Sequence, residues 1–475
     1  MRERFDAVII GAGPGGEVAL NTLVKAGKCV ALIENDVIGG ECSNWGCIPT
    51  KTLLRPSELE GNCERTAGVA TPALDFERLA AYRDFMVVNH DDSRRVTHYG
   101  ERGVTVIKDT ARIAGPNRVE VGGRVLETDA IIVATGAEAV VPPIPGLREA
   151  GYWTNREATD LTEIPSSVVV IGGGPVGIEL AQFLARFGSG VTLVQGPAKL
   201  ADREAPQIGD ALQAILEGDG IELRLGVHAV EVSVDGDEKI VHLDDGTEAR
   251  GEVLLVATGR RPRTHDIGLE TVGIEPTKRG IEVDERMRAG DGVWAIGDVT
   301  GVAAFTHVAK YQARVAVADI LGQDAKADYR AVPRVIFTDP EVAAVGLTEA
   351  EAAEQGIEID AVTLDLPTSI ARPYTFQEKP TGTFGIVVDR KRQVLLGAWA
   401  VAPLAGEWIH TAVFAIRAEI PVSVLKDTIA QFPSFSEAFG AALRALPDAE
   451  RHEVMIDHCA HAVLQEAERE TAAAR

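Results

Sequence analysis

The sequence predicts an α/β fold with two Rossmann-like domains, followed by a third domain of the α+β class. Glycine-rich loops at 11–16 and 172–177 each follow an apolar run and precede a helix-like stretch. A segment at 129–136 has an echo at 252–259, as expected when one fold occurs twice in a chain. With 475 residues, the chain is long enough for about three domains.

The first glycine loop lies inside a complete strand, loop, helix and strand unit. Residues 5–10 form an apolar run typical of a buried parallel strand. Residues 17–26 predict a helix that Gly27 ends, and residues 29–33 predict the next strand. This order is typical of a dinucleotide-binding unit, whose glycines let the backbone approach a pyrophosphate. The loop glycines expected to bind a cofactor are Gly11, Gly13 and Gly16.

A second unit of the same kind begins near residue 167. We expect its strand at 168–171, its helix at 178–187 and the following strand at 191–194. The echoed segments lie closer together than the two loops do, so the first domain carries an insertion. Further cofactor-binding glycines are expected in the second loop and at the ends of both echoes: Gly172, Gly174, Gly177, Gly136 and Gly259.

The two units differ at the position where a dinucleotide-binding unit usually has an acidic residue. Glu34 lies 23 residues after Gly11, where an acid can bind ribose hydroxyls. The same spacing in the second unit leads to Gln195, an amide that can bond ribose but does not repel a 2′-phosphate. Lys199 and Arg203 follow, either to bind such a phosphate or as solvated surface charges. The sequence therefore leaves NADH and NADPH both open.

The pattern changes between the two units and again after them. Residues 104–133 predict short β segments with turns, and the proline-rich 142–146 marks the crossing to the second domain. From residue 333 onward strand-like runs precede helical ones, which predicts an α+β domain. The expected strands are 385–388 and 394–401, and the expected helical stretches are 406–418 and 434–446.

Composition argues against several classes of partner. The 71 acidic and 47 basic residues give a net charge of −24, whereas nucleic acids and anionic membranes need clustered Lys and Arg. No apolar stretch approaches the roughly 18 residues of a membrane-spanning helix, and no signal core follows the N-terminus. Five cysteines are too few for a disulfide framework, so we expect a cytoplasmic location. Cys29 is expected in a strand core, and Cys459, between His458 and His461, on a helix surface rather than at a metal.

Two cysteines, Cys42 and Cys47, follow the first unit closely. On a regular helix, residues five apart point about 140° apart. A disulfide needs Cα atoms within about 7 Å, so these two can bridge only if the segment is distorted. Gly46 between them and Pro49 after them allow that distortion. A thiol pair beside a dinucleotide site suggests electron transfer between a flavin and a disulfide, and a zinc site would need more ligands.

The chain resembles the pyridine nucleotide–disulfide oxidoreductases, which include dihydrolipoamide dehydrogenase, glutathione reductase and mercuric reductase. The resemblance covers nearly the whole chain, and the motif with two cysteines is highly specific to this family. It rests on both glycine loops, Cys42 and Cys47 with residues 48–51, Gly297 with Asp298, and residues 337–343 and 345–349. It implies an FAD-binding domain at 1–152 and 281–332, an NAD(P)-binding domain at 153–280 and a dimerisation domain at 333–475.

The resemblance also implies roles for individual residues. The first loop and Glu34 would bind FAD, and Asp298 would bond its ribityl chain. Residues 305–309 would open a helix whose N-terminus faces the flavin and stabilises its reduced anion. Within that helix, His307 is expected to pack against its surroundings rather than to act as a catalyst.

For the dithiol, the resemblance implies that Cys47 is the thiolate nearest the flavin and that Cys42 is the thiol that attacks the acceptor. Lys51 would sit near flavin N5 and pair with Glu179. A nearby helix N-terminus or cation would lower the pKa of the thiol.

The sequence departs from the family at the acid–base position. Disulfide reductases of the family have a histidine before a proline there, with a glutamate that orients it, whereas this chain has Phe432 and Glu437. Proton transfer of this kind contributes about 10²–10⁴-fold, so reduction of an ordinary disulfide would be slow unless a histidine elsewhere substitutes. Mercuric reductase and a ketone-carboxylating member also depart from this histidine.

We therefore expect a homodimeric FAD enzyme that takes electrons from NADPH or NADH through Cys42 and Cys47. Its acceptor would be non-standard: a small disulfide, a quinone or a metal ion. One alternative is a direct flavin-to-quinone reductase with the cysteines as bystanders. Another is an inactive homologue that acts as a structural partner in a complex.

Overall fold

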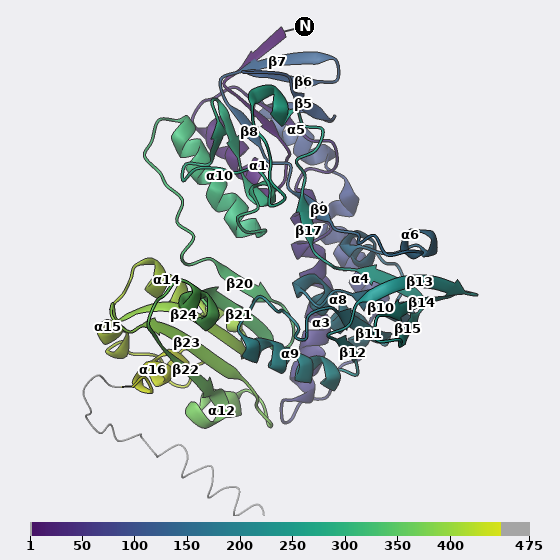
Figure 1. Ribbon diagram of the computed structural model, residues 1–475, viewed down its shortest axis with the longest axis vertical. Helices are drawn as coiled ribbons and strands as arrows, with labels where there is room; N and C mark the ends of the chain where they lie inside the picture. The colour runs from purple at the N-terminus through teal and green to yellow at the C-terminus, as the bar shows by residue number, and fades with distance from the viewer. Residues whose placement is uncertain (1, 448–475) are drawn as a thin grey trace, which may run out of the picture. The chain divides into compact units, whose positions relative to one another are not determined.

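Two parallel sheets in the computed structural model carry the two glycine loops (Figure 1). In the first sheet, β18 pairs antiparallel with β19 and all other neighbours are parallel. Its strands, in spatial order, are β18 (Arg288–Gly290), β19 (Val293–Ala295), β8 (Ile131–Val133), β2 (Ala7–Ile10), β3 (Val30–Ile33) and β4 (Thr105–Ile107). The second sheet is wholly parallel, in the order β12 (Glu222–Leu225), β11 (Gly190–Gln195), β10 (Ser167–Ile171) and β16 (Val253–Val256).

The central strands are buried on both faces, which explains their continuous apolar runs. Val8 and Ile9 of β2 are fully buried, and so are the valines at the centre of β10. Each central strand leads through its loop into a helix whose first residue is a proline, a residue favoured there because it needs no N–H partner. These helices are α1 (Pro14–Lys25) and α8 (Pro175–Arg186). The two predicted Rossmann-like units are therefore confirmed.

Smaller antiparallel elements surround these sheets. β1 pairs parallel with β7, and β7, β6 and β5 follow as antiparallel neighbours. β13, β14 and β15 form a separate antiparallel sheet, and β9 pairs with β17. Their bounds are β1 (Arg2–Phe5), β5 (Ala111–Ile113), β6 (Arg118–Val121), β7 (Arg124–Thr128), β9 (Ala137–Ala139), β13 (Ala229–Asp235), β14 (Glu238–Leu243), β15 (Glu248–Gly251) and β17 (Arg260–Pro262).

Several helices complete this part of the chain. α10 (Thr306–Ile320) packs beside α1, as Figure 1 shows. The others, in chain order, are α2 (Gly40–Asn44), α3 (Cys47–Glu64), α4 (Phe76–Met86), α5 (Ser93–Glu101), α6 (Leu147–Ala150) and α7 (Asn155–Thr159), with short 3-10 turns η1 (Val88–His90), η2 (Leu269–Val272) and η3 (Gly297–Thr300).

The third predicted domain is built on a five-stranded antiparallel sheet. Its spatial order is β20 (Pro333–Ile336), β21 (Glu341–Gly346), β24 (Val394–Ala402), β23 (Thr383–Asp389) and β22 (Ile359–Asp365). Helices pack on this sheet around a core that contains Phe384, Trp408 and Phe439. The α+β prediction is confirmed. Its helices are α11 (Glu349–Glu354), α12 (Leu366–Ser369), α13 (Ala405–Trp408), α14 (His410–Arg417), α15 (Val422–Lys426) and α16 (Glu437–Arg444), with η4 (Arg372–Thr375).

The structure describes residues 2–447, so the expectations for His458, Cys459 and His461 lie outside it. The chain divides into two compact units. Unit 1 comprises 1–55, 75–196 and 221–328, and unit 2 comprises 56–74, 197–220 with α9 (Pro206–Gly218), and the chain from residue 329 onward. Within residues 2–447 no helix is both long and apolar enough to cross a lipid bilayer. The expectation for Cys29 is wrong: β3 begins one residue later, and Cys29 is exposed.

Candidate active site

The first glycine of each loop touches the end of an echoed segment. A Cβ at Gly11 would lie 2.3 Å from the carbonyl oxygen of Ala134. A Cβ at Gly172 would lie 2.4 Å from the equivalent oxygen of Ala257. Only glycine permits such an approach. In each unit, the glycine loop therefore passes directly over the end of the repeated segment, 129–136 or 252–259. Two residues after that alanine, each repeated segment ends at a glycine with positive φ, Gly136 or Gly259.

Two further glycines of each loop differ in how much space surrounds them. A Cβ at Gly16 or Gly177 would lie 2.0 Å or 1.9 Å from the carbonyl oxygen of the first glycine of its loop. A Cβ at Gly13 or Gly174 would meet nothing within 4 Å. Each loop therefore presents open backbone at a helix N-terminus, which fits the pyrophosphate of a dinucleotide.

Glu34 and Gln195 occupy equivalent places in the two units. Glu34 Oε2 accepts a hydrogen bond from the Ala12 N–H at 2.7 Å, and Gln195 Oε1 accepts one from the Gly173 N–H at 2.8 Å. Both side chains are buried. The residue at the predicted acid position thus supports its own glycine loop in each unit, whether it is charged or neutral.

Two cations near Gln195 in sequence or in space, Lys199 and His228, are paired with carboxylates. His228 lies against the end of β11, because a Cβ at Gly196 would be 2.5 Å from His228 Nε2. His228 Nδ1 is 3.1 Å from Asp244 Oδ2. In unit 2, Lys199 Nζ is 2.6 Å from Asp210 Oδ1. These pairings are relevant to the choice between NADH and NADPH, which the sequence leaves open.

The expected distortion between the two cysteines is present. α2 ends before Trp45, whose φ of −135° is not helical, and α3 starts two residues later at Cys47. A Cβ at Gly46 would lie 3.3 Å from Cys42 Cα, so this glycine lets the chain fold back closely. Both cysteines are free thiols, and their side chains hydrogen-bond to each other. The break brings together two side chains that a straight helix would hold apart.

The two thiols have opposite electrostatic character. The hydrogen bond from Cys42 is the main cause that lowers the pKa of Cys47 to about 6, with support from Thr306 and Lys51 against the effect of burial. The Cys47 Sγ lies 3.5 Å from Thr306 Oγ1, at the first residue of α10. The same hydrogen bond, together with burial, raises the pKa of Cys42. Cys47 is therefore the thiolate and Cys42 keeps the proton.

Lys51 and Glu179 pair as expected. Lys51 Nζ lies 2.5 Å from Glu179 Oε2, and Glu179 is buried on α8. This contact connects the helix that follows the dithiol with the helix that follows the second glycine loop.

Asp298 and His307 lie near the N-terminus of α10. Burial raises the pKa of Asp298, against the opposing charge of Arg260, whose Nε is 3.9 Å away. His307 stacks on Phe305 with ring centroids 5.2 Å apart, which agrees with a packing role.

Phe432 and Glu437 belong to unit 2. Phe432 is 75% exposed. Glu437 Oε2 accepts a hydrogen bond from the Ser434 N–H at 2.9 Å. Glu437 thus supports the turn before α16.

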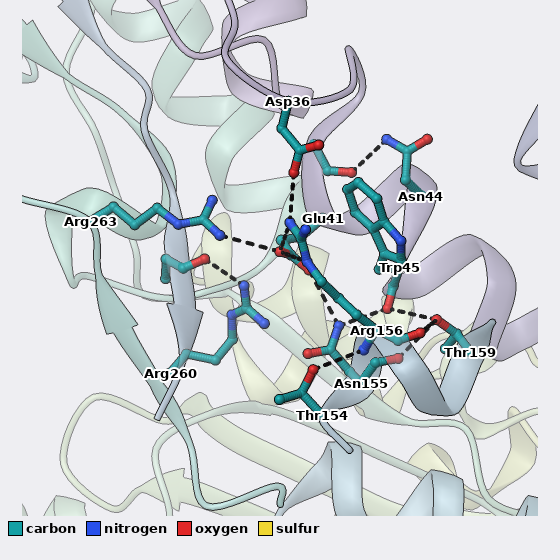
Figure 2. A network of polar contacts seen from close by, with 12 residues as sticks. Asp36, Glu41, Asn44, Trp45, Thr154, Asn155, Arg156, Thr159, Arg260 and Arg263 are labelled. Atoms are coloured by element: carbon teal, nitrogen blue, oxygen red, sulfur yellow. Dashed lines mark hydrogen bonds and ion pairs between the residues drawn. The ribbon is translucent and has the colours of Figure 1, made fainter. Parts of the chain in front are cut away.

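A polar network that the sequence analysis missed surrounds Glu41, next to Cys42 (Figure 2). Arg156 Nη2 is 2.6 Å from Glu41 Oε1 and 3.0 Å from Asp36 Oδ2. Burial is the largest influence and works to raise the pKa of Glu41, but the hydrogen bond and charge of Arg156, with Arg260 and Asn155, together outweigh it, so the pKa falls below its usual value. Arg156 is 115 residues from Glu41 and Thr306 is 259 residues from Cys47, and no local motif marks either residue.

Within residues 2–447 no cluster of three or more His, Cys, Asp or Glu side chains is arranged to hold a metal ion.

Two glycine-loop domains with a polarised thiol pair beside them define a dinucleotide-dependent dithiol oxidoreductase. Comparison with known proteins agrees. The family model described as pyridine nucleotide–disulphide oxidoreductase matches residues 5–313, and its dimerisation domain matches residues 332–443. The chain belongs to the pyridine nucleotide–disulphide oxidoreductase family, whose members are enzymes that depend on FAD and use NAD(P)H.

Several relatives align over nearly all of this chain. A mercuric reductase from Bacillus cereus is 34% identical over 449 residues, covering 92% of this chain and 71% of that protein. RclA from Escherichia coli, a probable pyridine nucleotide-disulfide oxidoreductase, is 33% identical over 92% of this chain and 98% of its own length. The solved copper(II) complex of RclA, a HOCl-induced flavoprotein disulfide reductase, superposes with a TM-score of 0.82 over 93% of this chain and 99% of RclA, at 32% identity.

Proposed function

We propose that this protein is a homodimeric, FAD-dependent NAD(P)H oxidoreductase that passes electrons through Cys42 and Cys47 to a small-molecule acceptor. The observation that carries the proposal is the break between α2 and α3, which brings Cys42 and Cys47 together beside Thr306. In this setting the pKa of Cys47 is lowered and that of Cys42 is raised. An ionised sulfur can remain beside an electron-accepting ring while its protonated neighbour meets the acceptor. A cytoplasmic location is part of this proposal.

The chain's own residues would divide the work. The loop of Gly13, supported by Glu34, would hold FAD, and the loop of Gly174, supported by Gln195, would hold NAD(P)H. Bound FAD would supply the two-electron redox chemistry that connects the nicotinamide to the disulfide. Lys51, fixed by its contact with Glu179, supplies a positive charge beside Cys47.

The proposed reaction has two stages, reduction of the disulfide and its re-formation. One NAD(P)H and one proton reduce the Cys42–Cys47 disulfide to two thiols and release NAD(P)⁺. The two thiols then give two electrons to the acceptor and the disulfide forms again. Their two protons go to the acceptor if it is a disulfide or a quinone, and to solvent if it is a metal ion. Without a histidine at residue 432, the second stage favours an acceptor that needs little help with proton transfer. Candidates are a small disulfide, a quinone and a metal ion, and the mercuric reductases among the relatives make a metal ion worth testing.

The exposed phenyl group of Phe432 supports a second candidate, direct flavin-to-quinone reduction with the cysteines as bystanders. An apolar side chain at the place of the usual acid–base group suits a flat apolar acceptor better than a charged one.

One experiment separates these functions. The purified protein is reduced anaerobically with NADH or NADPH while flavin absorbance is followed, and then small disulfides, quinones and metal ions are added in turn. In the Cys42→Ser variant, we expect flavin bleaching by the coenzyme to persist and disulfide reduction to vanish. Quinone reduction that survives in Cys42→Ser at the wild-type rate would favour the second candidate. Failure of either coenzyme to bleach the flavin would favour the inactive structural homologue.

A further inference from the structure

Trp45, the residue at the break between α2 and α3, is held by side chains to which the proposed function assigns no role. Its carbonyl oxygen accepts hydrogen bonds from Asn155 Nδ2 at 2.8 Å and from Thr159 Oγ1 at 3.4 Å, as Figure 2 shows. Its indole Nε1 donates to Asp160 Oδ2 at 3.2 Å. The last carbonyls of a helix have no partner within it, so these donors satisfy the end of α2 from outside.

The indole ring of Trp45 is also held through its faces. The His90 imidazole stacks on it with centroids 5.0 Å apart and planes 13° apart. The Arg156 guanidinium lies 3.9 Å from the ring centroid, within the range of a cation–π contact. Because Arg156 also pairs with Glu41, it connects both ends of α2. We call His90, Asn155, Arg156, Thr159 and Asp160 the Trp45 clamp.

His90 reaches Trp45 from an unusual backbone. Val88, Asn89 and His90 have φ values of 55°, 49° and 55°, three successive residues in the left-handed region that favours glycine. A β-branched residue there is a genuine outlier, and such strain persists only where surrounding contacts over-determine it. The partner of His90 is Asp160, whose Oδ1 lies 3.0 Å from His90 Nε2. Since a carboxylate only accepts, Nε2 carries the hydrogen and one carboxylate holds both rings.

The clamp is anchored to the second parallel sheet. α7, which supplies Asn155, Arg156 and Thr159, begins with a capping box formed by Thr154 and Glu157. The residue before that box, Trp153, pairs its backbone with Leu255 of β16. The donors that hold the helix break are therefore fixed on rigid elements of unit 1 rather than on a free loop.

We propose that the Trp45 clamp is a positioning device that keeps the helix break in the shape that lets Cys42 and Cys47 interconvert between dithiol and disulfide. The inference rests on the proposed function, because it concerns the same sulfur pair. Beyond that function, His90 and Asp160 gain a measurable effect on the stability of the disulfide. Among the described contacts, none joins either residue to a sulfur.

The clamp would act by raising the effective concentration of one sulfur at the other. A disulfide needs its Cα atoms within about 7 Å, and a regular helix would hold these cysteines apart. When the clamp residues hold the break, the two sulfurs stay close in the dithiol as well. The segment then loses little conformational freedom when the disulfide forms. A looser break leaves the dithiol more freedom and therefore shifts the equilibrium away from the disulfide.

The test measures that equilibrium directly. The protein is equilibrated with mixtures of oxidised and reduced glutathione, in which one oxidised glutathione takes two electrons and two protons from the dithiol and becomes two reduced molecules. Free thiols are then trapped by alkylation, and Cys42 and Cys47 are quantified by peptide mass spectrometry. We expect His90→Ala and Asp160→Asn each to lower the equilibrium constant for the disulfide about tenfold, which equals a shift of about 30 mV towards easier reduction.

Matched variants separate positioning from general stability. His98→Ala removes a histidine of the same unit that packs on Tyr99 rather than on Trp45, and the equilibrium is expected to stay at the wild-type value. Val88→Gly relieves the strained turn but keeps the His90 ring, so the melting temperature is expected to change while the equilibrium does not. Trp45→Phe keeps an aromatic ring but loses the donor to Asp160, and we expect a shift between wild type and His90→Ala.

The outcomes are distinguishable. If the wild-type protein forms the disulfide and both His90→Ala and Asp160→Asn keep its equilibrium constant, the clamp has no positioning role. If His90→Ala does not fold, Asp160→Asn and Trp45→Phe decide the matter by the same measurement. If the wild-type protein forms no Cys42–Cys47 disulfide in any glutathione mixture, the proposed function itself fails.

Discussion

Lys51 and Glu179 lie 128 residues apart in the chain and form an ion pair with 2.5 Å between Nζ and Oε2. The Glu179 side chain is 4% exposed and that of Lys51 is 33% exposed. A carboxylate buried to this extent needs a partner, and its partner is the lysine that also lowers the pKa of the Cys47 thiol. The pair therefore links a helix of the second Rossmann-like unit to the electrostatics of the dithiol.

Glu179→Gln removes this charge and keeps the side-chain shape. We expect the free energy of unfolding to fall by about 1–2 kcal/mol, since one partner is a third exposed and solvent screens the pair. Flavin bleaching by NAD(P)H is expected to slow about tenfold, because Lys51 loses its anchor. Urea denaturation and stopped-flow absorbance measure the two effects.

Asp210→Asn is the matched control for Glu179→Gln. It breaks the pair between Lys199 and Asp210, whose side chains are 44% and 65% exposed, so stability is expected to change by less than about 0.5 kcal/mol. Equal destabilisation by both substitutions would contradict the structural importance of the Lys51–Glu179 pair.

The reactivity of the reduced protein is expected to follow the ionisation of Cys47. The pKa of Cys47 is lowered to about 6, so its alkylation by iodoacetamide should rise through pH 6 and level off near pH 7. Cys42, whose pKa is raised, should stay unreactive over this range. Cys42→Ala removes the main cause of the shift, so the midpoint for Cys47 should move upward. Identical midpoints in wild type and variant would show that Cys42 does not stabilise the thiolate.

The same shifts predict how the stability of the reduced protein depends on pH. Cys47 has a folded pKa of about 6, below the roughly 8.5 of an unfolded cysteine, so its stabilising contribution is lost as pH falls from about 8.5 through 6. Cys42 has a raised pKa, so its contribution is present below about pH 8.5 and is lost at higher pH. The contribution of the two cysteines to the free energy of unfolding, measured with urea, should therefore be greatest near pH 8–9. The Cys42→Ser/Cys47→Ser double variant, which lacks both groups, should lose this maximum.

The coenzyme site is expected to prefer NADH. A 2′-phosphate carries close to two negative charges and needs cations. His228, the cation that lies against the end of β11, is already paired with Asp244. We expect KM for NADH to be about tenfold lower than KM for NADPH. Steady-state kinetics with both coenzymes measures the ratio.

Asp244→Asn tests the cause of this preference. Without the carboxylate, the His228 imidazole loses its paired anion, and the preference should move towards NADPH. Asp245→Asn, at the neighbouring residue whose carboxylate bonds Thr247 instead, serves as the control. A preference for NADPH in the wild-type protein would contradict the argument from paired cations.

Phe432→His restores an ionisable group at the position where the family has its acid–base histidine. We expect reduction of a small disulfide to rise at least tenfold, and flavin bleaching by the coenzyme to stay unchanged. Because Phe432 is 75% exposed, the substitution should cost little stability. Phe414→His, at another exposed phenylalanine of unit 2, is the control and should leave turnover unchanged. Equal turnover in wild type and Phe432→His would show that the acceptor needs no proton from this position.

Sequence reasoning identified the elements whose chemistry is local. The glycine loops, their flanking strands and the helix that follows each one depend on neighbouring residues, and they lie where the sequence predicts. The resemblance to the family added the expected pair of Lys51 and Glu179, which local pattern cannot supply. The exposed position of Cys29 was missed, because a strand end cannot be distinguished from a strand interior by an apolar run alone.

The sequence by itself determined that two nucleotide-type units carry a thiol pair beside the first of them, and that this pair needs a distorted helix. Only the tertiary structure decided what maintains the distortion and which side chains lower the pKa of Cys47, the sulfur that the family resemblance had already implied to be the thiolate. Trp45 is fixed by His90, Arg156 and Asp160, and Cys47 by Thr306. The physical reason is that stacking, ion pairing and hydrogen bonding act over a few ångströms in space, whereas these partners lie tens to hundreds of residues away along the chain.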